Sequence, residues 1–318
     1  MLAIARNECT VLNEWLAHYQ QEGVSHFHII DHGLNQECSA PRPNVTWYSW
    51  GLKASTGRSN QAEAYSSVIN RIHSDWIAIF DLDEFAFGVH HSLAAVLTSL
   101  PHHIAQFCMP WITYGSSGHE SQPPCVTASC IHRAAWPSEA LAKCITRRQD
   151  LLMPGIHRSL LLHETGWNRT RGKTACMCAD RSPCDTHRRL TGPERIKAQA
   201  KLRPFWLSGW PPSQPCDQLS ARSIRRQEVR LHHYAAQSLS NMRRKSANAD
   251  ADVPNQKRDH WYWRRMERIS NTIVDTTLSR RSVCRNTDAR GTDAKPYIGY
   301  VGANALHGDH APQWSDET

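Results

Sequence analysis

The chain has 318 residues, of which 40% are hydrophobic and 21% are charged, a usage that is typical of globular proteins and excludes a disordered chain. No run approaches the roughly 18 uncharged apolar residues that a membrane-spanning helix needs, so we expect no membrane span in this chain. The 37 basic and 29 acidic residues give a net charge of +8, which suits a nucleotide diphosphate or an acidic acceptor as well as a nucleic acid.

The first residues alternate between a strand pattern and a helix pattern. Residues 1–5 are an apolar run, which predicts a buried strand that delivers Arg6, Asn7 and Glu8 to the carboxyl edge of a sheet. Apolar residues at helical spacing follow, and Gly23 is well placed to end that helix.

A second strand is predicted for residues 24–30, and it ends at Asp31. No Gly-x-Gly-x-x-Gly turn joins the first strand to its helix, so we do not expect a dinucleotide-binding Rossmann site. Asp31 either accepts hydrogen bonds from a ribose or a base, or it is an ordinary turn residue at a strand end. The spacing alone favours neither interpretation.

The alternation continues along the chain. Further strands are predicted at 45–49, 76–80 and 105–109, and helices at 61–72 and 93–100. This order predicts an α/β fold with a mainly parallel central sheet.

Three carboxylates in four positions follow the strand at 76–80. Asp81, Asp83 and Glu84 stand where open α/β sheets bind their ligands, and two acids at i and i+2 can bind one hard cation. We interpret Asp81 and Asp83 as a Mg²⁺ or Mn²⁺ site that holds a substrate phosphate, with a merely solvated strand end as the competing interpretation. A second Asp-x-Asp triplet, at 250–252, has no strand before it and is interpreted as a loop.

Two later segments add candidate residues. The small-residue loop at 111–120 ends in the titratable pair His119 and Glu120, and such a loop brings backbone close to a ligand. A possible strand places Lys143 and Arg147 on one side, facing solvent or phosphate.

The strand and helix pattern of the sequence stops in the second half of the chain and then resumes. Between about 165 and 226 cysteine, arginine and proline dominate without a sustained period, which predicts an insertion or a loosely packed lid. The strand-like run at 228–234 then brings His233, a candidate metal ligand because an imidazole often completes a carboxylate site. The predicted division is an N-terminal part, an insertion, a C-terminal part that completes the same domain, and a flexible tail, at 1–164, 165–227, 228–283 and 284–318.

Cysteine usage leaves the redox compartment open. Eleven cysteines are many for a cytosolic chain and few for a disulfide scaffold, and the odd count leaves at least one thiol free or paired between chains. Cys176, Cys178 and Cys184 resemble half of a zinc site, without a second pair at the proper spacing.

Taken in order, these residues resemble the family 92 glycosyltransferases, once catalogued as domain of unknown function 23, and their family 2 type relatives. The resemblance covers about residues 1 to 163 and 228 to 275. The matching stretches are Arg6–Glu8, Asn13–Tyr19, Gly23–Val24, His28–Asp31, Gln61, Trp76, Asp81–Phe85, Tyr114–His119, Lys143, Gly155–His157, His233–Tyr234 and Ser238.

The resemblance implies a GT-A fold, a UDP- or GDP-sugar donor and a glycan or glycoconjugate acceptor, with no nucleic acid partner. It implies Mn²⁺, or Mg²⁺, at Asp81 and Asp83, and we choose His233 as the remaining ligand, with His157 second. The implied donor-binding residues are Arg6, Asn7, Glu8, Asp31, Gln61 and Lys143.

Family members of this kind invert the anomeric centre, so one carboxylate or histidine should deprotonate the acceptor hydroxyl. The candidates for this base are Glu120, His119 and Glu84. Lys143 is normally followed by a basic-proline signature, and here Arg147 and Arg148 lack the proline, which leaves the acceptor side open.

Two other functions fit the same residues. One is a metal-dependent phosphoryl-transfer or phosphodiester enzyme, and the other is a basic, non-catalytic binding module. Localisation is also open, because the chain as given would be cytoplasmic, whereas a missing N-terminal anchor would make it a Golgi-lumenal or membrane-associated protein.

Overall fold

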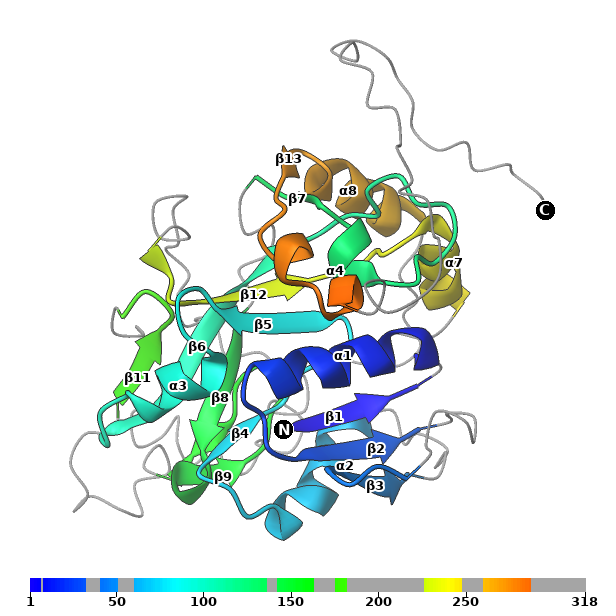
Figure 1. The fold of residues 1–318 in the computed structure, drawn as a ribbon. Coiled ribbons are helices and arrows are strands. Elements are labelled where there is room, and N and C mark those ends of the chain that lie inside the picture. Colours follow the sequence, from blue (N-terminus) through cyan, green and yellow to red (C-terminus); the bar gives the residue numbers. More distant parts are fainter. Residues whose placement is uncertain are drawn as a thin grey trace, which may run out of the picture.

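We describe the fold from a computed structural model, which defines residues 1–6, 8–32, 41–50, 60–135, 142–162, 175–181, 226–247 and 260–286. Strands and helices alternate through these residues, as Figure 1 shows. The predicted α/β fold class with a mainly parallel sheet is confirmed by the strand pairings below.

The first sheet contains three parallel strands in the order β1-β2-β3. A parallel bridge between Leu2 and Ile79 connects it to β4, so the carboxyl ends of β1, β2 and β4 face the same edge. The bounds are β1 Leu2–Ala5, β2 Phe27–Asp31, β3 Val45–Ser49 and β4 Trp76–Ala78.

The second sheet has the order β4-β8-β6-β12-β5, and β11 pairs with β6 in addition to this order. β6, β11 and β12 are parallel to one another, whereas β8 and β5 are antiparallel to their neighbours. The bounds are β5 Glu84–Gly88, β6 Ile104–Thr113, β8 Ala142–Arg147, β11 Ala175–Cys178 and β12 Val229–His233. Short strands are β7 His132–Arg133, β9 Leu151–Met153, β10 Leu160–Leu161 and β13 Ile273–Val274.

Two strands of the second sheet, β5 and β11, were not expected from the sequence. Glu84 begins β5, although the acidic cluster was interpreted as the point where the chain leaves the sheet. β11 lies within the segment that was predicted to be irregular, and it extends the sheet beside β6. Since β12 lies between β5 and β6, the sheet contains strands from both the N-terminal and the C-terminal parts of the chain.

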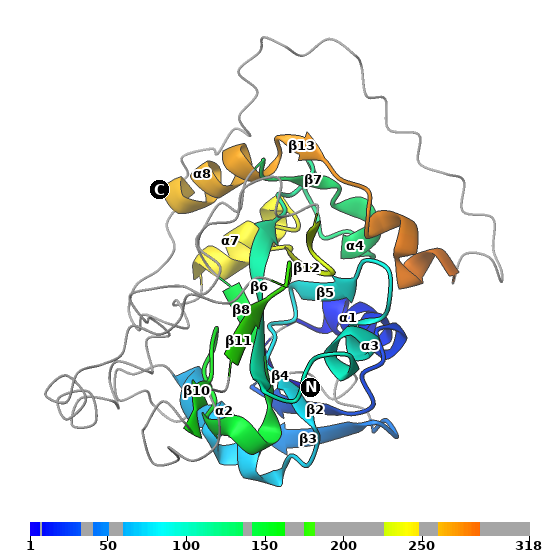
Figure 2. The ribbon, with the colours of Figure 1, turned by 90° about the vertical axis from the view of Figure 1, so that its left-hand side faces the viewer.

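Helices cover both faces of the sheet (Figures 1 and 2). Ala3 and Ala5 of β1 belong to the core that also contains Trp15 of α1, whereas Leu2 packs with Tyr65 of α2 on the other face. This alternation along a strand is the expected result of side chains pointing to opposite faces. The helices are α1 Cys9–Gln21, α2 Asn60–Val68, α3 Leu93–Thr98, α4 Val126–Ser129, α7 Leu239–Ala247 and α8 His260–Ser270.

Short 3₁₀ turns complete the described elements, and the last two lie near the end of the described chain. They are η1 Ile69–Arg71, η2 Arg148–Asp150, η4 Ser279–Arg281 and η5 Val283–Asn286. No helix in the described ranges is both long enough and apolar enough to cross a membrane.

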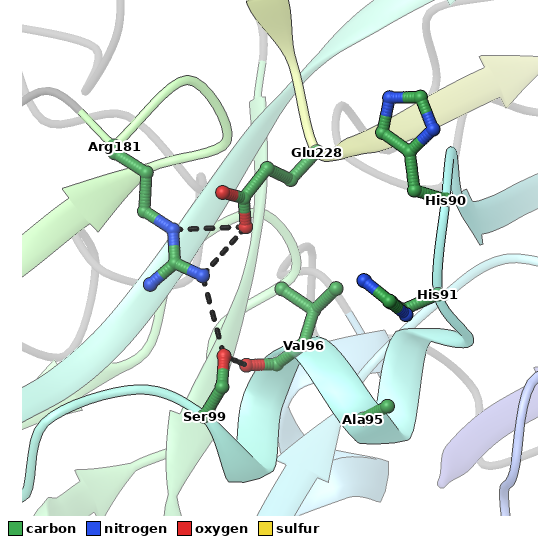
Figure 3. Close-up of a pocket in the computed structure, with 7 residues that line it drawn as sticks. All are labelled: His90, His91, Ala95, Val96, Ser99, Arg181 and Glu228. Atoms are coloured by element: carbon green, nitrogen blue, oxygen red, sulfur yellow. Dashed lines mark hydrogen bonds and ion pairs between the residues drawn. The ribbon is translucent and has the colours of Figure 1, made fainter.

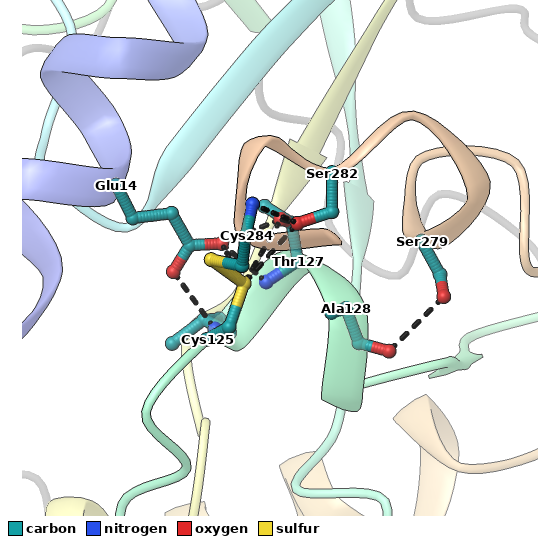
Figure 4. Close-up of a disulfide and its surroundings, with 8 residues drawn as sticks. Glu14, Cys125, Thr127, Ala128, Ser279, Ser282 and Cys284 are labelled. Carbon is teal, nitrogen blue, oxygen red and sulfur yellow. Dashed lines mark hydrogen bonds between the residues drawn. A yellow bond between two sulfur atoms is a disulfide. The ribbon is translucent and has the colours of Figure 1, made fainter. Parts of the chain in front are cut away.

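Disulfides join segments that are distant in sequence. Cys108 of β6 is bonded to Cys144 of β8, and Cys125 is bonded to Cys284 of η5, next to the buried Glu14 of α1 (Figure 4). Residue 284, predicted to begin a flexible tail, is therefore fixed to the core.

The zinc hypothesis for the cysteine-rich segment is not supported. Cys176 and Cys178 are disulfide-bonded, so their sulfurs are not thiolate ligands, and Cys184 lies outside the described residues. Cys130 is a buried free thiol, and burial raises the pKa of its sulfur.

Candidate functional site

The predicted site residues gather at the carboxyl edge of the parallel strands. Asp31 ends β2, Asp81 follows β4 and His233 ends β12, so three strands bring polar side chains to this edge. Trp15 of α1 fixes the acidic turn, because its Nε1 donates to the backbone oxygens of Asp81 and Glu84, both at 3.1 Å.

Asp81 is held by two side chains. Lys143 Nζ of β8 lies 2.9 Å from Asp81 Oδ2, and Gln61 Nε2 of α2 donates to Asp81 Oδ1 at 3.0 Å. The side chain of Asp81 remains 32% exposed, so a part of it is open to solvent. Gln61, which was predicted to bind the donor, therefore orients the first aspartate in this structure.

Lys143 and Glu84 form the buried part of the cluster. Both side chains are 0% exposed, Lys143 Nζ lies 3.2 Å from Glu84 Oε2, and the same oxygen accepts from the backbone N–H of Asp81. Burial raises the pKa of Glu84 well above its ordinary value, against the opposing charge of Lys143. Lys143 thus cannot reach a diphosphate in this arrangement, and Glu84 cannot reach an acceptor hydroxyl.

Asp83 has a different environment, which the sequence did not reveal. Lys245 Nζ of α7 lies 2.6 Å from Asp83 Oδ2, and His233 Nε2 lies 3.6 Å from Asp83 Oδ1. Burial opposes ionisation, but Lys245 and His233 outweigh it and hold the pKa of Asp83 well below its ordinary value. The backbone N–H of Tyr234 donates to the Asp83 carbonyl at 2.8 Å, which fixes the end of β12 against the acidic turn.

Aromatic packing positions the histidine. The ring centroids of Trp111 and His233 are 4.1 Å apart, and the centroids of Trp111 and His157 are 5.2 Å apart. Trp111 and Tyr114 are both buried and pack against histidines, so neither offers a flat face to a sugar or a base. Their role here is to pack against the histidine rings and hold them in place.

Glu8 is a further carboxylate near this edge, beside Asp81 and Asp83. It lies at the N-cap of α1, and its pKa is raised to about 7 by burial, then by the negative charge of Asp83 and, more weakly, of Asp81. Arg6 is exposed beside it, and Asn7 lies outside the described residues. The three acids therefore concentrate negative charge at one place, which a bound cation would relieve.

Asp31 lies at the same edge with Arg6. Both charges act on His32, whose pKa is lowered mainly by burial and by Arg6, while Asp31 opposes that shift. Arg6 and Asp31 thus provide polar groups near the predicted nucleotide side.

The loop after β6 connects the site to the C-terminal helices. Ser116 donates both its backbone N–H and its hydroxyl to the carboxylate of Glu267 in α8. His119 Nε2 donates to the Ser129 carbonyl at 3.3 Å, whereas Glu120 is exposed. Of the two base candidates in this loop, only Glu120 has its titratable group turned to solvent.

The donor set has the chemistry of a divalent cation site. Carboxylates with an imidazole suit Mn²⁺, and the 3.6 Å between Asp83 Oδ1 and His233 Nε2 is too long for a hydrogen bond but short enough for both atoms to bind one ion. His233 Nδ1 is buried and has no hydrogen-bond partner among the described residues. Asp83 and His233 therefore fit one cation, whereas the ligand atoms of Asp81, Asp83 and His233 do not all lie within 4.8 Å of one another.

These residues do not form a preformed metal site with closely spaced ligand atoms. Within the described ranges, the one group of three potential ligands whose atoms all lie within 4.8 Å of one another is Glu14, Cys125 and Cys284. That group is not a metal site, because the two sulfurs form a disulfide and Glu14 accepts backbone hydrogen bonds from α4.

A separate cavity of about 560 Å³ lies at the other end of β12. An ion pair between Arg181 and Glu228 forms one side of it, and His90 and His91 lie on the opposite side (Figure 3). Glu228 precedes β12 and His233 ends it, so the length of the strand separates this cavity from the acidic cluster.

No family model matches the chain, and no curated protein matches it in sequence. Among solved structures, the chain is similar to the mannosyltransferase PcManGT from Pyrobaculum calidifontis in complex with GDP-Man and Mn²⁺, at 15% identity over 34% of each chain and a TM-score of 0.28. It is also similar to the galactosyltransferase LgtC in complex with donor and acceptor sugar analogs, at 12% identity over 34% of this chain and 45% of that one, with a TM-score of 0.25.

A third similar structure is a putative glucose-1-phosphate thymidylyltransferase from Bacillus anthracis, at 9% identity over 64% of this chain and 94% of that one, with a TM-score of 0.31. The matches to the two glycosyltransferases span less than half of those chains. These likenesses are partial and distant, and they carry no functional conclusion for this chain. Its likeness to family 92 glycosyltransferases remains an expectation from the sequence.

Proposed function

We propose that this chain is a metal-dependent, inverting glycosyltransferase of the GT-A type. It moves a sugar from a UDP- or GDP-linked donor to a hydroxyl group of a glycan or glycoconjugate. The observation that supports this best is the meeting of Asp83 and His233, at 3.6 Å, where the carboxyl end of β12 lies beside the start of β5. The ordered set of family-like residues in the sequence supports the same proposal.

Asp81, Asp83 and His233 would hold the cation, with Gln61 orienting the first carboxylate. A divalent ion bound there supplies the positive charge that stabilises a departing nucleoside diphosphate. Arg6 contributes further positive charge at the nucleotide side of the edge.

Glu120 is the proposed base that takes the proton of the acceptor hydroxyl. It is exposed in the loop after β6, whereas Glu84 is completely buried and His119 donates its ring N–H to a backbone oxygen. The carboxylate of Glu120 is therefore the candidate with open access to an acceptor.

The deciding experiment is a thermal-shift measurement with UDP, GDP and their sugars, each with and without Mn²⁺. A ligand that binds the native state raises its melting temperature, so stabilisation by a nucleotide that requires Mn²⁺ is expected for the wild type and not for Asp83→Asn. Stabilisation by nucleic acid or phosphate esters, without turnover of nucleotide sugars, would instead favour the phosphodiester alternative. Unchanged ligand binding in the double variant Asp81→Asn, Asp83→Asn would favour the binding module.

We also propose that the chain folds in an oxidising compartment, because its disulfides connect distant elements of the core. Alkylation of the unfolded protein, followed by mass spectrometry, tests this proposal. Cys125 and Cys284 should react only after reduction, and reaction without reduction would argue for a reducing compartment.

A further inference from the structure

Lys245 is a positive charge at the site that the sequence did not indicate. It lies in the last turn of α7, where its Nζ contacts Asp83 Oδ2 at 2.6 Å and the Ala235 carbonyl at 3.0 Å. Its side chain is 18% exposed, so solvent reaches a part of it.

The contact places an ammonium group on an oxygen that a metal ion would also use. Asp83 is nearly buried and ionised, so it needs a positive partner at all times. A divalent cation that enters alone must displace this ammonium or be repelled by it, since the two charges would share one carboxylate. A cation that enters with a nucleoside diphosphate also brings negative phosphate oxygens, which offer Lys245 a new partner.

We propose that Lys245 is the exchangeable counter-ion of Asp83: it leaves Asp83 for the diphosphate of the donor when metal and nucleotide bind, and so makes their binding cooperative. This inference rests on the proposed function, because it needs a nucleotide diphosphate and a cation at the same site. It goes further by assigning the diphosphate to a particular side chain.

The position of α7 permits this exchange without movement of the helix. Backbone N–H groups of Leu239 and Ser240 donate to the carbonyls of His119 and Glu120, both at 2.9 Å, which fixes the first turn. Lys245 lies in the last turn, and a lysine side chain has a flexible four-carbon stem that can redirect its charge. Lys143 cannot make the same exchange, because it is completely buried between two acids.

The test measures Mn²⁺ binding directly by calorimetry, with and without saturating UDP or GDP. In Lys245→Met we expect Mn²⁺ alone to bind about tenfold more tightly than in the wild type, because the competing ammonium is gone. The factor by which nucleotide strengthens Mn²⁺ binding should fall by about the same amount. Lys245→Arg should keep most of this coupling, and Lys245→Gln repeats the test if the methionine variant does not fold.

Arg243→Met is the matched control, since it removes a positive charge from the exposed side of the same helix. It should leave both the Mn²⁺ affinity and the coupling unchanged. If Mn²⁺ and nucleotide bind to the wild type but Lys245→Met and Lys245→Gln leave the coupling intact, the role of Lys245 is overturned and the proposed function stands. If the wild type binds neither Mn²⁺ nor nucleotide, both proposals fall.

Discussion

The two aspartates that follow β4 each contact a lysine, yet the two pairs differ in nearly every other respect. Lys143 is completely inaccessible and also contacts the buried Glu84, whereas Lys245 is partly exposed and contacts an aspartate that faces His233. Equal pairs of charges can thus serve different purposes. The buried pair shapes the acidic turn, and the accessible pair is the one that a ligand can rearrange.

The largest expected effect comes from breaking the buried pair. Lys143→Met leaves Asp81 and Glu84 without a cation inside the protein, which should destabilise the fold by about 3–5 kcal/mol. Urea unfolding measures this loss. Lys245→Met is the matched comparison and should cost less, because Lys245 is 18% exposed and Asp83 keeps His233 beside it. Equal losses in the two variants would contradict the distinction.

The next effect separates the two aspartates by activity and stability together. Asp83→Asn should lower kcat/KM for the nucleotide sugar by about 100-fold or more, and it should lower the unfolding free energy less than Asp81→Asn does, because the Lys245 that it leaves unpaired is 18% exposed whereas Lys143 is completely buried. Asp81→Asn should lower both, because it also removes a partner of the buried Lys143. Steady-state kinetics and urea unfolding on the same samples test this. A pure stability loss in Asp83→Asn would contradict the assigned role.

The two remaining glutamates sharpen the same contrast. Glu120→Gln should lower kcat by about 100-fold or more with little change in KM for the donor, as expected for loss of a general base. Glu84→Gln should instead act on stability, since Glu84 is buried beneath the site. Steady-state kinetics and urea unfolding on the same samples distinguish the roles, because only Glu120→Gln should lose activity and keep its stability.

The smallest expected effect concerns Glu8. Its pKa of about 7 lies above the ordinary 4.5, so the folded protein keeps a proton that the unfolded chain loses. Wild-type stability should therefore fall as pH rises from about 4.5 to about 7. Glu8→Gln removes this fall. The difference in melting temperature between Glu8→Gln and the wild type should therefore grow by a few degrees across that window and stay constant at higher pH. Glu120→Gln, at an exposed position, should show no such trend.

The sequence predicted most of the elements that form the sheet, because apolar runs and helical spacing are local signals. The strand at Val45–Ser49 has the predicted bounds, and β12 covers residues 229–233 of the predicted run at 228–234. β5 was missed because the acidic run before it indicated a turn, although Glu84 already belongs to the strand. β11 was missed because its cysteines carry no period-two pattern.

The sequence by itself determined the α/β class and the delivery of acids and a histidine to strand ends, since hydrophobic periodicity and strand direction fix both. The tertiary structure decided which charges meet. Lys143 was predicted to face solvent or phosphate, and it is buried. Lys245 was not predicted to belong to the site, and it contacts Asp83, which is 162 residues away in the sequence. Such pairings depend on how strands and helices pack. A buried charge is costly unless it is paired, and the packing of the fold determines which partner lies beside it.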